Sequence, residues 1–317
     1  MLFKLYGLII SSDEILSGLT SISKSKPDVQ IRHFFCSEHF PSPSHWFMKW
    51  YLPGGKLWLS FAKINENYLL RFNKLADFLI NKHGRKIVCL SKPGIPKETI
   101  QHLLLDQVIP LVINLRGGEA LHASAVLSPQ GVIAFIGPTG SGKSTIAASL
   151  LLAHYPHLSD DCLTLIEKTK AIYVIPAYPG LRLWKDSLAF LFGDNGDCNL
   201  VAHYTDKLRS VIENRPRTYC TVPQPLRRLY SISLLHNPKK KTNILIEPLS
   251  PRESFMALVQ CAFRLDIKDN NMLIRQFYFL GRVASKVSVR RLIFPRNFSI
   301  LPAVREAIVN DLKNLDN

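Results

Sequence analysis

The chain has 317 residues, of which 47% are hydrophobic and 20% charged, with a formal net charge of +16. These values are typical of a globular protein with one large or two smaller domains, and they exclude a largely disordered chain. The most apolar stretch, Leu103–Leu115, is too short for a membrane span and is interrupted by Asp106 and Pro110. Residues 1–10 lack the basic leader and cleavage site of a signal peptide, so we expect a first strand there.

Cysteine spacing and charge distribution exclude two further classes of protein. The six cysteines contain no C-x-x-C pair, which argues against a disulfide framework or a zinc site and predicts a cytoplasmic protein. The basic excess is spread over residues 1–105 and 178–317, and its one compact run, Lys239–Lys241, resembles a solvated turn. Without zinc-finger spacing or an RNA-recognition signature, nucleic acid is not the expected partner.

The first hundred residues predict a β-rich domain, because short apolar runs alternate with clusters of Pro, Gly, Asn and Ser. Apolar residues at helical intervals then predict one helix over Pro96–Arg116, with Thr99 as its N-cap and Gly117-Gly118 at its end. We therefore expect a domain over residues 1–100 and a second domain over 101–317.

Two apolar runs follow, Glu119–Leu127 and Val132–Ile136, joined by Ser128-Pro129-Gln130-Gly131. This pattern predicts an antiparallel hairpin. The second run leads into the pattern G-x-x-x-x-G-K-[ST] and then into an apolar helix from Thr145, which is the context in which this loop binds nucleoside triphosphates. The predicted nucleotide-binding residues are Gly137, Pro138, Thr139, Gly140, Ser141, Gly142, Lys143, Ser144 and Thr145.

The chemistry of phosphate binding explains these residue types. Glycines allow successive backbone N–H groups to turn toward an anion, and the helix that begins near Lys143 adds the positive end of its dipole. Lys143 is expected to reach the β- and γ-phosphates of ATP, and the Ser144 hydroxyl to coordinate Mg²⁺.

Two adjacent carboxylates, Asp160 and Asp161, come after this helix and before the apolar run Leu163–Ile166, so we expect them where a strand begins. Beside phosphates and Mg²⁺, one carboxylate can hold the metal while the other accepts a proton from an incoming hydroxyl.

The succession of LHASAV at Leu121–Val126, the hairpin, GPTGSGKST and LSDD resembles the catalytic domain of the HPr kinase/phosphorylase family, a bacterial protein-serine kinase fold related to phosphoenolpyruvate carboxykinase. The resemblance implies an α/β fold, a P-loop kinase domain with a mixed sheet, preceded here by the β-rich domain. It further implies that Asp160 is the base that deprotonates an acceptor serine, that Asp161 supports the metal with Ser144, and that His122 tunes the proton affinity of the pair.

The chain also departs from the family. Members that act on HPr carry a glutamate before an Arg-Gly after the acid pair, whereas Ala171–Lys185 contains no acidic residue. This argues against HPr as the acceptor and against the reverse, phosphorolytic reaction. The leading prediction is thus an ATP–Mg²⁺-dependent kinase that acts on a hydroxyl of a protein, peptide or small molecule, with serine as the expected acceptor.

Other functions stay open. The absent glutamate also fits a nucleotide-dependent binding switch or a slow NTPase without an acceptor, and the charge leaves a nucleic-acid-associated ATPase as a third reading. Because HPr kinases are hexamers, the resemblance also implies a possible homo-oligomer.

Later in the chain, Ser250 and Glu253 predict a capping box at a helix start. Isolated cations that could contact phosphates, or be solvated loop residues, are Arg182, Lys207, Arg209, Arg227 and Arg228.

Overall fold

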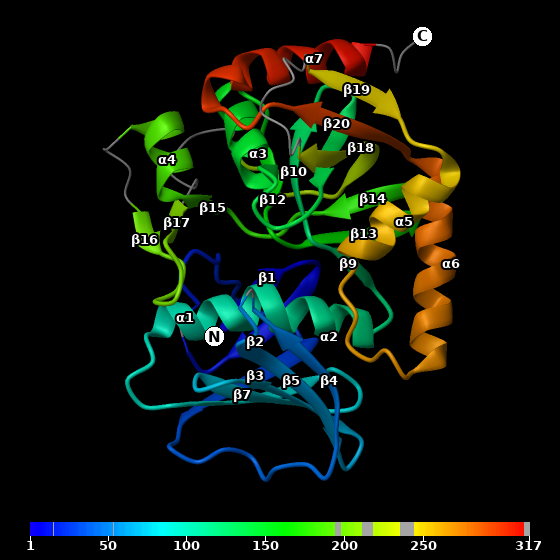
Figure 1. The fold of residues 1–317 in the computed structure, drawn as a ribbon. Coiled ribbons are helices and arrows are strands. Elements are labelled where there is room, and N and C mark those ends of the chain that lie inside the picture. Colours follow the sequence, from blue (N-terminus) through cyan, green and yellow to red (C-terminus); the bar gives the residue numbers. More distant parts are fainter. Residues whose placement is uncertain (15, 53, 194–197, 211–217, 235–243, 314–317) are drawn as a thin grey trace. The chain divides into compact units, whose positions relative to one another are not determined.

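The computed structural model describes residues 1–14, 16–52, 54–193, 198–210, 218–234 and 244–313 (Figure 1). The chain is a mixed α/β protein that divides into two compact units. Unit 1 comprises Met1–Gly118, Val201–Thr205 and Arg264–Ile274, and unit 2 comprises the remaining three stretches, Glu119–Leu200, Asp206–Phe263 and Arg275–Asn317. Lys239–Lys241, expected to form a solvated turn, lies outside the described residues. No helix among the described residues is long and apolar enough to cross a membrane.

Unit 1 is built on an eight-stranded sheet in the order β1-β2-β3-β8-β7-β6-β5-β4. Its strands are β1 (Leu2–Leu5), β2 (Leu8–Ser12), β3 (Val29–Phe35), β4 (Trp46–Tyr51), β5 (Leu57–Ile64), β6 (Asn67–Phe72), β7 (Ala76–Ile80) and β8 (Lys86–Ser91). The segment Arg264–Ile274 also belongs to this unit, where Asp266 pairs with Lys63 of β5 at 2.6 Å.

The single helix predicted over Pro96–Arg116 is interrupted in the structure. It consists of α1 (Lys97–Leu103), a π-helical turn (Leu104–Val108) and α2 (Ile109–Leu115). Pro110 explains the interruption, because it has no N–H to donate and its ring crowds the carbonyl four residues earlier. The N-cap prediction is wrong: Pro96 precedes the first helical residue, and the Thr99 hydroxyl contacts His203 Nδ1 at 2.8 Å. Both helices cluster with unit 1, so the boundary lies after Gly118 and not after residue 100.

Unit 2 contains a nine-stranded sheet with the order β12-β10-β11-β18-β14-β13-β9, to which β20 adds beside β18 and β19 beside β20. The bounds are β9 (Glu119–Leu121), β10 (Ala123–Ser128), β11 (Gly131–Ile136), β12 (His157–Ser159), β13 (Leu163–Lys168), β14 (Ala171–Ile175), β18 (Gln224–Leu234), β19 (Leu245–Pro248) and β20 (Ser288–Phe294). β11 pairs antiparallel with β10 and parallel with β18, and β20 is parallel to β18. The sheet is therefore mixed.

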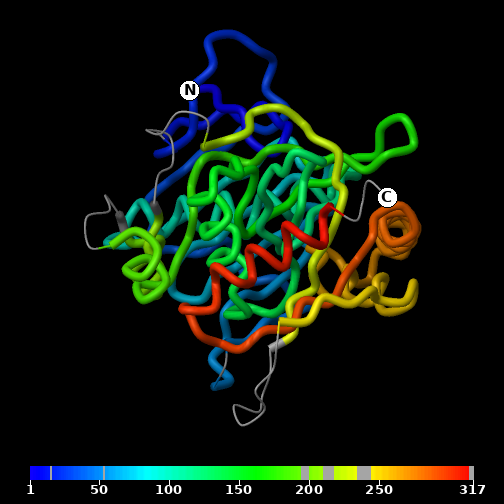
Figure 2. The backbone as a smooth tube through the Cα atoms, turned by 90° about the horizontal axis from the view of Figure 1, so that it is seen from above, coloured from blue at the N-terminus to red at the C-terminus, as the bar shows by residue number. Residues whose placement is uncertain are grey.

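Helices cover both faces of the strands around β11 (Figure 1). Ile133 and Phe135 of β11 pack with α3 (Lys143–Leu152) and α7 (Leu301–Lys313), whereas the alternate residues Val132, Ala134 and Ile136 pack with α5 (Pro251–Cys261) and α6 (Asn270–Lys286). This two-residue alternation follows from strand geometry, and burial on both faces explains why β11 is apolar throughout. Figure 2 shows α7, in red, running over these strands.

The predicted hairpin is confirmed, with Ser128 paired to Gly131 and Ala123 to Ile136. The first run is not one strand, however. It breaks at His122, whose backbone N–H donates to the carbonyl of Cys261 at 2.7 Å. β9 then pairs with β13, while β10 pairs with β11 and β12. The break places His122 at a junction between two ladders.

A smaller three-stranded sheet in unit 2, ordered β15-β17-β16, follows β14. Its strands are β15 (Leu181–Trp184), β16 (Cys198–Leu200) and β17 (Lys207–Ser210), with α4 (Lys185–Phe192) directly after β15. The predicted capping box at α5 is confirmed by the reciprocal contacts of Ser250 and Glu253.

Candidate functional site

The loop between β11 and α3 has the backbone conformation that its glycines allow. Gly137, Gly140 and Gly142 have φ values of 146°, 80° and 96°. A Cβ on Gly137 would lie 3.0 Å from Ser141 Oγ and 3.1 Å from the carbonyl oxygen of Ile232. A side chain at Gly137 would therefore displace either the loop or β18, so only glycine fits there.

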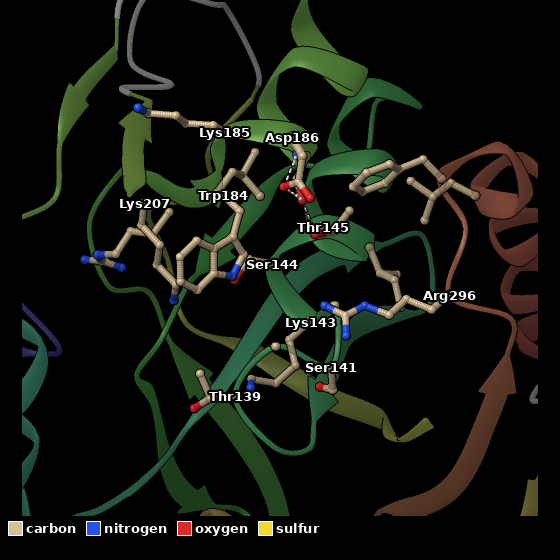
Figure 3. Close-up of a pocket in the computed structure, with 18 of the residues that line it drawn as sticks. Thr139, Ser141, Lys143, Ser144, Thr145, Trp184, Lys185, Asp186, Lys207 and Arg296 are labelled. Atoms are coloured by element: carbon tan, nitrogen blue, oxygen red, sulfur yellow. Dashed lines mark hydrogen bonds between the residues drawn. The ribbon is translucent and has the colours of Figure 1, made fainter. Parts of the chain in front are cut away.

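The loop opens on a cavity of about 740 Å³ in unit 2. Its floor is formed by the loop and the first turn of α3, from Thr139 to Ile146. Figure 3 shows Trp184 and Lys207 on one side of this cavity and Arg296 on the other, with Lys143 and Ser144 between them. The remaining lining residues are His122, Asp161, Arg182, Leu183, Lys185, Asp186, Ser187, Asp206, Phe294, Asn297, Phe298 and Leu301.

Two side chains of the loop have donors suited to an anion. The Lys143 ammonium donates to the carbonyls of Gly137 at 2.9 Å and Pro138 at 3.1 Å, and burial lowers the pKa of Lys143. Ser141 Oγ is buried and has no hydrogen-bond partner among the described residues. A buried hydroxyl without a partner is costly, and a phosphate oxygen is an acceptor that would satisfy it.

Asp160 is connected directly to the loop. Its Oδ1 accepts hydrogen bonds from Ser144 Oγ at 2.8 Å and from Ser124 Oγ at 2.5 Å, and its Oδ2 accepts from the backbone N–H of Arg182 at 2.9 Å. Asp160 is 2% exposed and is absent from the cavity lining. Burial and then the charge of Asp161 raise the pKa of Asp160, while the Arg182 cation opposes them.

Asp161 has different surroundings from its neighbour. It lines the cavity and has a φ of 64°, the left-handed conformation in which a non-glycine residue is uncommon. Asp161 therefore differs from Asp160 both in its backbone conformation and in lining the cavity. The Arg182 guanidinium lies 3.6 Å from Asp161 Oδ2 and donates to the Asp160 carbonyl at 3.2 Å, so one buried cation serves both acids.

His122 supports Asp161 through the backbone. Its Nδ1 lies 3.0 Å from the Asp161 carbonyl oxygen, and since a carbonyl only accepts, Nδ1 is the protonated nitrogen. Burial, followed by the charge of Lys143, lowers the pKa of His122 to about 4. The imidazole is thus neutral near pH 7 and leaves Nε2 as an acceptor.

Ser144 and Asp160 fit a hard divalent cation. Mg²⁺ takes oxygen ligands and is commonly held by one or two carboxylates together with substrate phosphates, and Ser144 Oγ and Asp160 Oδ1 are such oxygens, 2.8 Å apart. Within the described residues, no group of three or more His, Cys, Asp or Glu side chains could hold a metal alone. A cation here would therefore take its remaining ligands from phosphate oxygens and water.

The structure brings the predicted residues together, with three differences in detail. Asp160, expected to be the base, is not part of the cavity lining. Thr139 to Thr145 line the cavity, whereas Gly137 and Pro138 shape the loop and bind Lys143 through their carbonyls. The acid pair follows a short strand, β12, as well as preceding β13. This strand is three residues long and begins with His157, so no apolar run revealed it.

Sequence reasoning missed Ser124 and underestimated Arg182. The sequence favours a solvated loop residue over a phosphate contact for Arg182, yet Arg182 is 2% exposed and its guanidinium bonds the Tyr178 hydroxyl. Its position in the apolar run Leu181–Leu183 was the available signal, because a charged residue buried in a strand needs partners.

Comparison with known proteins adds little to this geometry. No family model and no curated protein matches the chain. Among solved structures, the HPr(Ser) kinase/phosphatase from Coxiella burnetii resembles it with 11% sequence identity and a TM-score of 0.35, over 62% of this chain and 99% of that one. A likeness this distant carries no conclusion about activity.

Proposed function

We propose that the chain is an ATP–Mg²⁺-dependent phosphotransferase that moves the γ-phosphoryl group to a hydroxyl of a protein, peptide or small molecule. The observation that carries this proposal is the hydrogen bond between Ser144 Oγ and Asp160 Oδ1, with Asp161 opening into the same cavity. A phosphate loop joined to a carboxylate pair suits phosphoryl transfer, because the chemistry depends on positioning and charge neutralisation.

In this proposal, the loop amides and Lys143 hold the β- and γ-phosphates. Lys143 would exchange its hydrogen bonds to the carbonyls of Gly137 and Pro138 for phosphate oxygens. Ser144 and Asp160 would hold Mg²⁺, which neutralises charge on the phosphates when bound. This differs from the role that family resemblance implies for Asp160, because three donors already surround its carboxylate.

Asp161 is therefore the better candidate for the base. It would accept the proton of the acceptor hydroxyl as that oxygen bonds to the γ-phosphorus, while the bond from the γ-phosphorus to the bridging oxygen breaks and releases ADP. Arg182 would orient the Asp161 carboxylate, and His122 would hold the Asp161 backbone in the left-handed conformation.

The test is to incubate the purified chain with ATP labelled on the γ-phosphate, Mg²⁺ and an extract of its own cells, and to identify the labelled product. Asp161→Asn should lower the rate of label transfer by 10²-fold or more, the usual contribution of a positioned base, while ATP still binds. Asp206→Asn makes the same chemical change at an exposed cavity residue and is the matched control. If the wild-type chain binds ATP and labels nothing, the phosphotransferase proposal fails and a binding switch or slow NTPase remains.

A further inference from the structure

The cavity extends beyond the phosphate loop to a segment at the end of β20 that has no role in the proposed transfer step. Phe294 ends β20, and Arg296, Phe298 and Leu301 follow on the way into α7. We propose that this segment is a nucleobase subsite and that Arg296 stacks on the base. The inference rests on the proposed function, since it needs a triphosphate in the loop.

Sheet topology places this segment at the correct edge. β11, β18 and β20 are mutually parallel, so the residues after β20 emerge at the edge where the loop follows β11. β12 pairs antiparallel with β10, which is antiparallel to β11, so the acid pair after β12 emerges at this edge too. β12 lies two positions to one side of β11, and β20 two positions to the other. A triphosphate whose γ end faces the acids therefore directs its nucleoside toward β20.

The segment has the surface chemistry of a base site. Phe294 and Leu301 are buried and apolar, and a Cβ on Gly142 would lie 3.9 Å from the Phe294 ring, so this wall adjoins the loop. Arg296 is exposed, and among the described residues its guanidinium has no hydrogen bond or ion pair. Figure 3 shows its side chain extending toward the centre of the cavity. A planar guanidinium stacks well on a heteroaromatic ring.

Trp184 is another aromatic side chain of the cavity, and its position on β15 favours the acceptor side. It lies on β15 two residues after Arg182, which contacts both acids, and Lys207 Nζ lies 5.6 Å from its ring centroid. A base on Trp184 would put the nucleoside where the acceptor hydroxyl must approach Asp161.

The experiment measures dissociation constants of the full chain for ATP and for inorganic tripolyphosphate, both with Mg²⁺, by titration calorimetry. Tripolyphosphate fills the loop without a base. We expect ATP to bind about tenfold or more tightly than tripolyphosphate, the gain that base stacking typically provides. Arg296→Ala should remove most of this advantage and leave tripolyphosphate binding within about twofold. Trp184→Ala should retain the advantage, as should Arg252→Ala, an exposed arginine outside the cavity.

Each result decides the inference. Loss of the ATP advantage in Arg296→Ala alone supports the subsite. Equal binding of ATP and tripolyphosphate by the wild-type chain overturns the subsite while keeping the triphosphate site of the proposed function. Loss of the advantage in Trp184→Ala but not in Arg296→Ala overturns it by placing the base on the acid side. Failure to bind either probe means that the proposed function has failed, and the subsite with it.

Discussion

Arg182 is the residue on which the charge balance of the acid pair depends. Two carboxylates in one buried place repel each other, and the Arg182 guanidinium is the buried cation that contacts both residues. The Arg182 guanidinium carbon lies 5.2 Å from the centroid of the Tyr178 ring, and the guanidinium donates a hydrogen bond to the Tyr178 hydroxyl. These two contacts fix the orientation of Arg182. This makes Arg182 a positioning residue rather than a ligand for phosphate.

Arg182→Met should therefore change both stability and pH dependence. Removing one partner of a buried ionic group costs about 3–5 kcal/mol of unfolding free energy, because the remaining charges lose their compensation. Since the cation lowers the pKa of Asp160, its loss should raise the pKa of this carboxyl, the one proposed to hold Mg²⁺. The acidic limb of the profile of kcat/KM against pH should therefore move to higher pH. Urea unfolding of the same variant measures the loss of stability. Arg182→Lys should move the acidic limb part of the way back toward its wild-type pH. An unmoved limb in Arg182→Met would show that the cation does not act on Asp160.

His122 predicts a pH dependence of stability with a definite sign. Its pKa is about 4 in the folded chain and ordinarily 6.5, so between these values the unfolded chain binds a proton that the folded chain does not. Stability from this group is therefore complete above about pH 6.5 and falls as the pH drops toward 4. His122→Asn keeps an N–H donor for the Asp161 carbonyl but does not titrate. Urea unfolding at several pH values between 4 and 7 gives the dependence of the unfolding free energy on pH. This dependence should be weaker for His122→Asn, by the equivalent of up to one proton taken up on unfolding. Equal dependence in both proteins would contradict the assignment.

At the scale of elements, the loop between β11 and α3 is held by strand packing as much as by its own sequence. Gly137→Ala would place a methyl group 3.1 Å from the Ile232 carbonyl of β18. We expect it to destabilise unit 2 by about 1–3 kcal/mol, the usual cost of backbone strain, and to weaken ATP binding more than tenfold. Gly281→Ala in α6 is the matched control, because no atom lies within 4 Å of its added Cβ and alanine favours a helix. A Gly137→Ala variant that binds ATP normally would mean that the loop does not depend on this close approach.

The elements that the sequence predicted well are those with strong local signals. The hairpin of β10 and β11 and the capping box at Ser250 are set by residues close together in the chain. The errors came from long-range structure. The π-turn before Pro110 and the contact of Thr99 with His203 required knowledge of packing, and β12 was too short for periodicity. The buried position of Asp160 depends on Ser124, which only the β10–β12 pairing brings near.

At the scale of the whole chain, no single boundary in the sequence separates the two units, because each unit consists of three stretches. The segment Arg264–Ile274 lies late in the sequence but belongs to unit 1, where Leu265 is fully buried and Met272 is 6% exposed. Its contacts are specific: the Leu265 N–H donates to Asn114 Oδ1 at 3.4 Å, and Asp266 accepts from the Tyr68 hydroxyl at 3.3 Å. The domain boundary expected after residue 100 missed this return of the chain, because no local signal marks it.

A fragment of residues 119–317 should consequently be less soluble than the full chain. The fragment would expose Leu265 and Met272 and lose the free energy of burying each side chain, about 1.5–3 kcal/mol. It would also leave Asp266 without its ion-pair partner Lys63. We expect this fragment to associate at micromolar concentration in light-scattering measurements. The double substitution Leu265→Gln and Met272→Gln should reduce that association, whereas in the full chain the same pair should lower the unfolding free energy. The substitutions should thus improve the fragment and harm the full chain for the same reason. Side chains that are buried in unit 1 become exposed apolar surface once residues 1–118 are removed. A fragment that stays monomeric without the substitutions would show that unit 2 covers this segment itself.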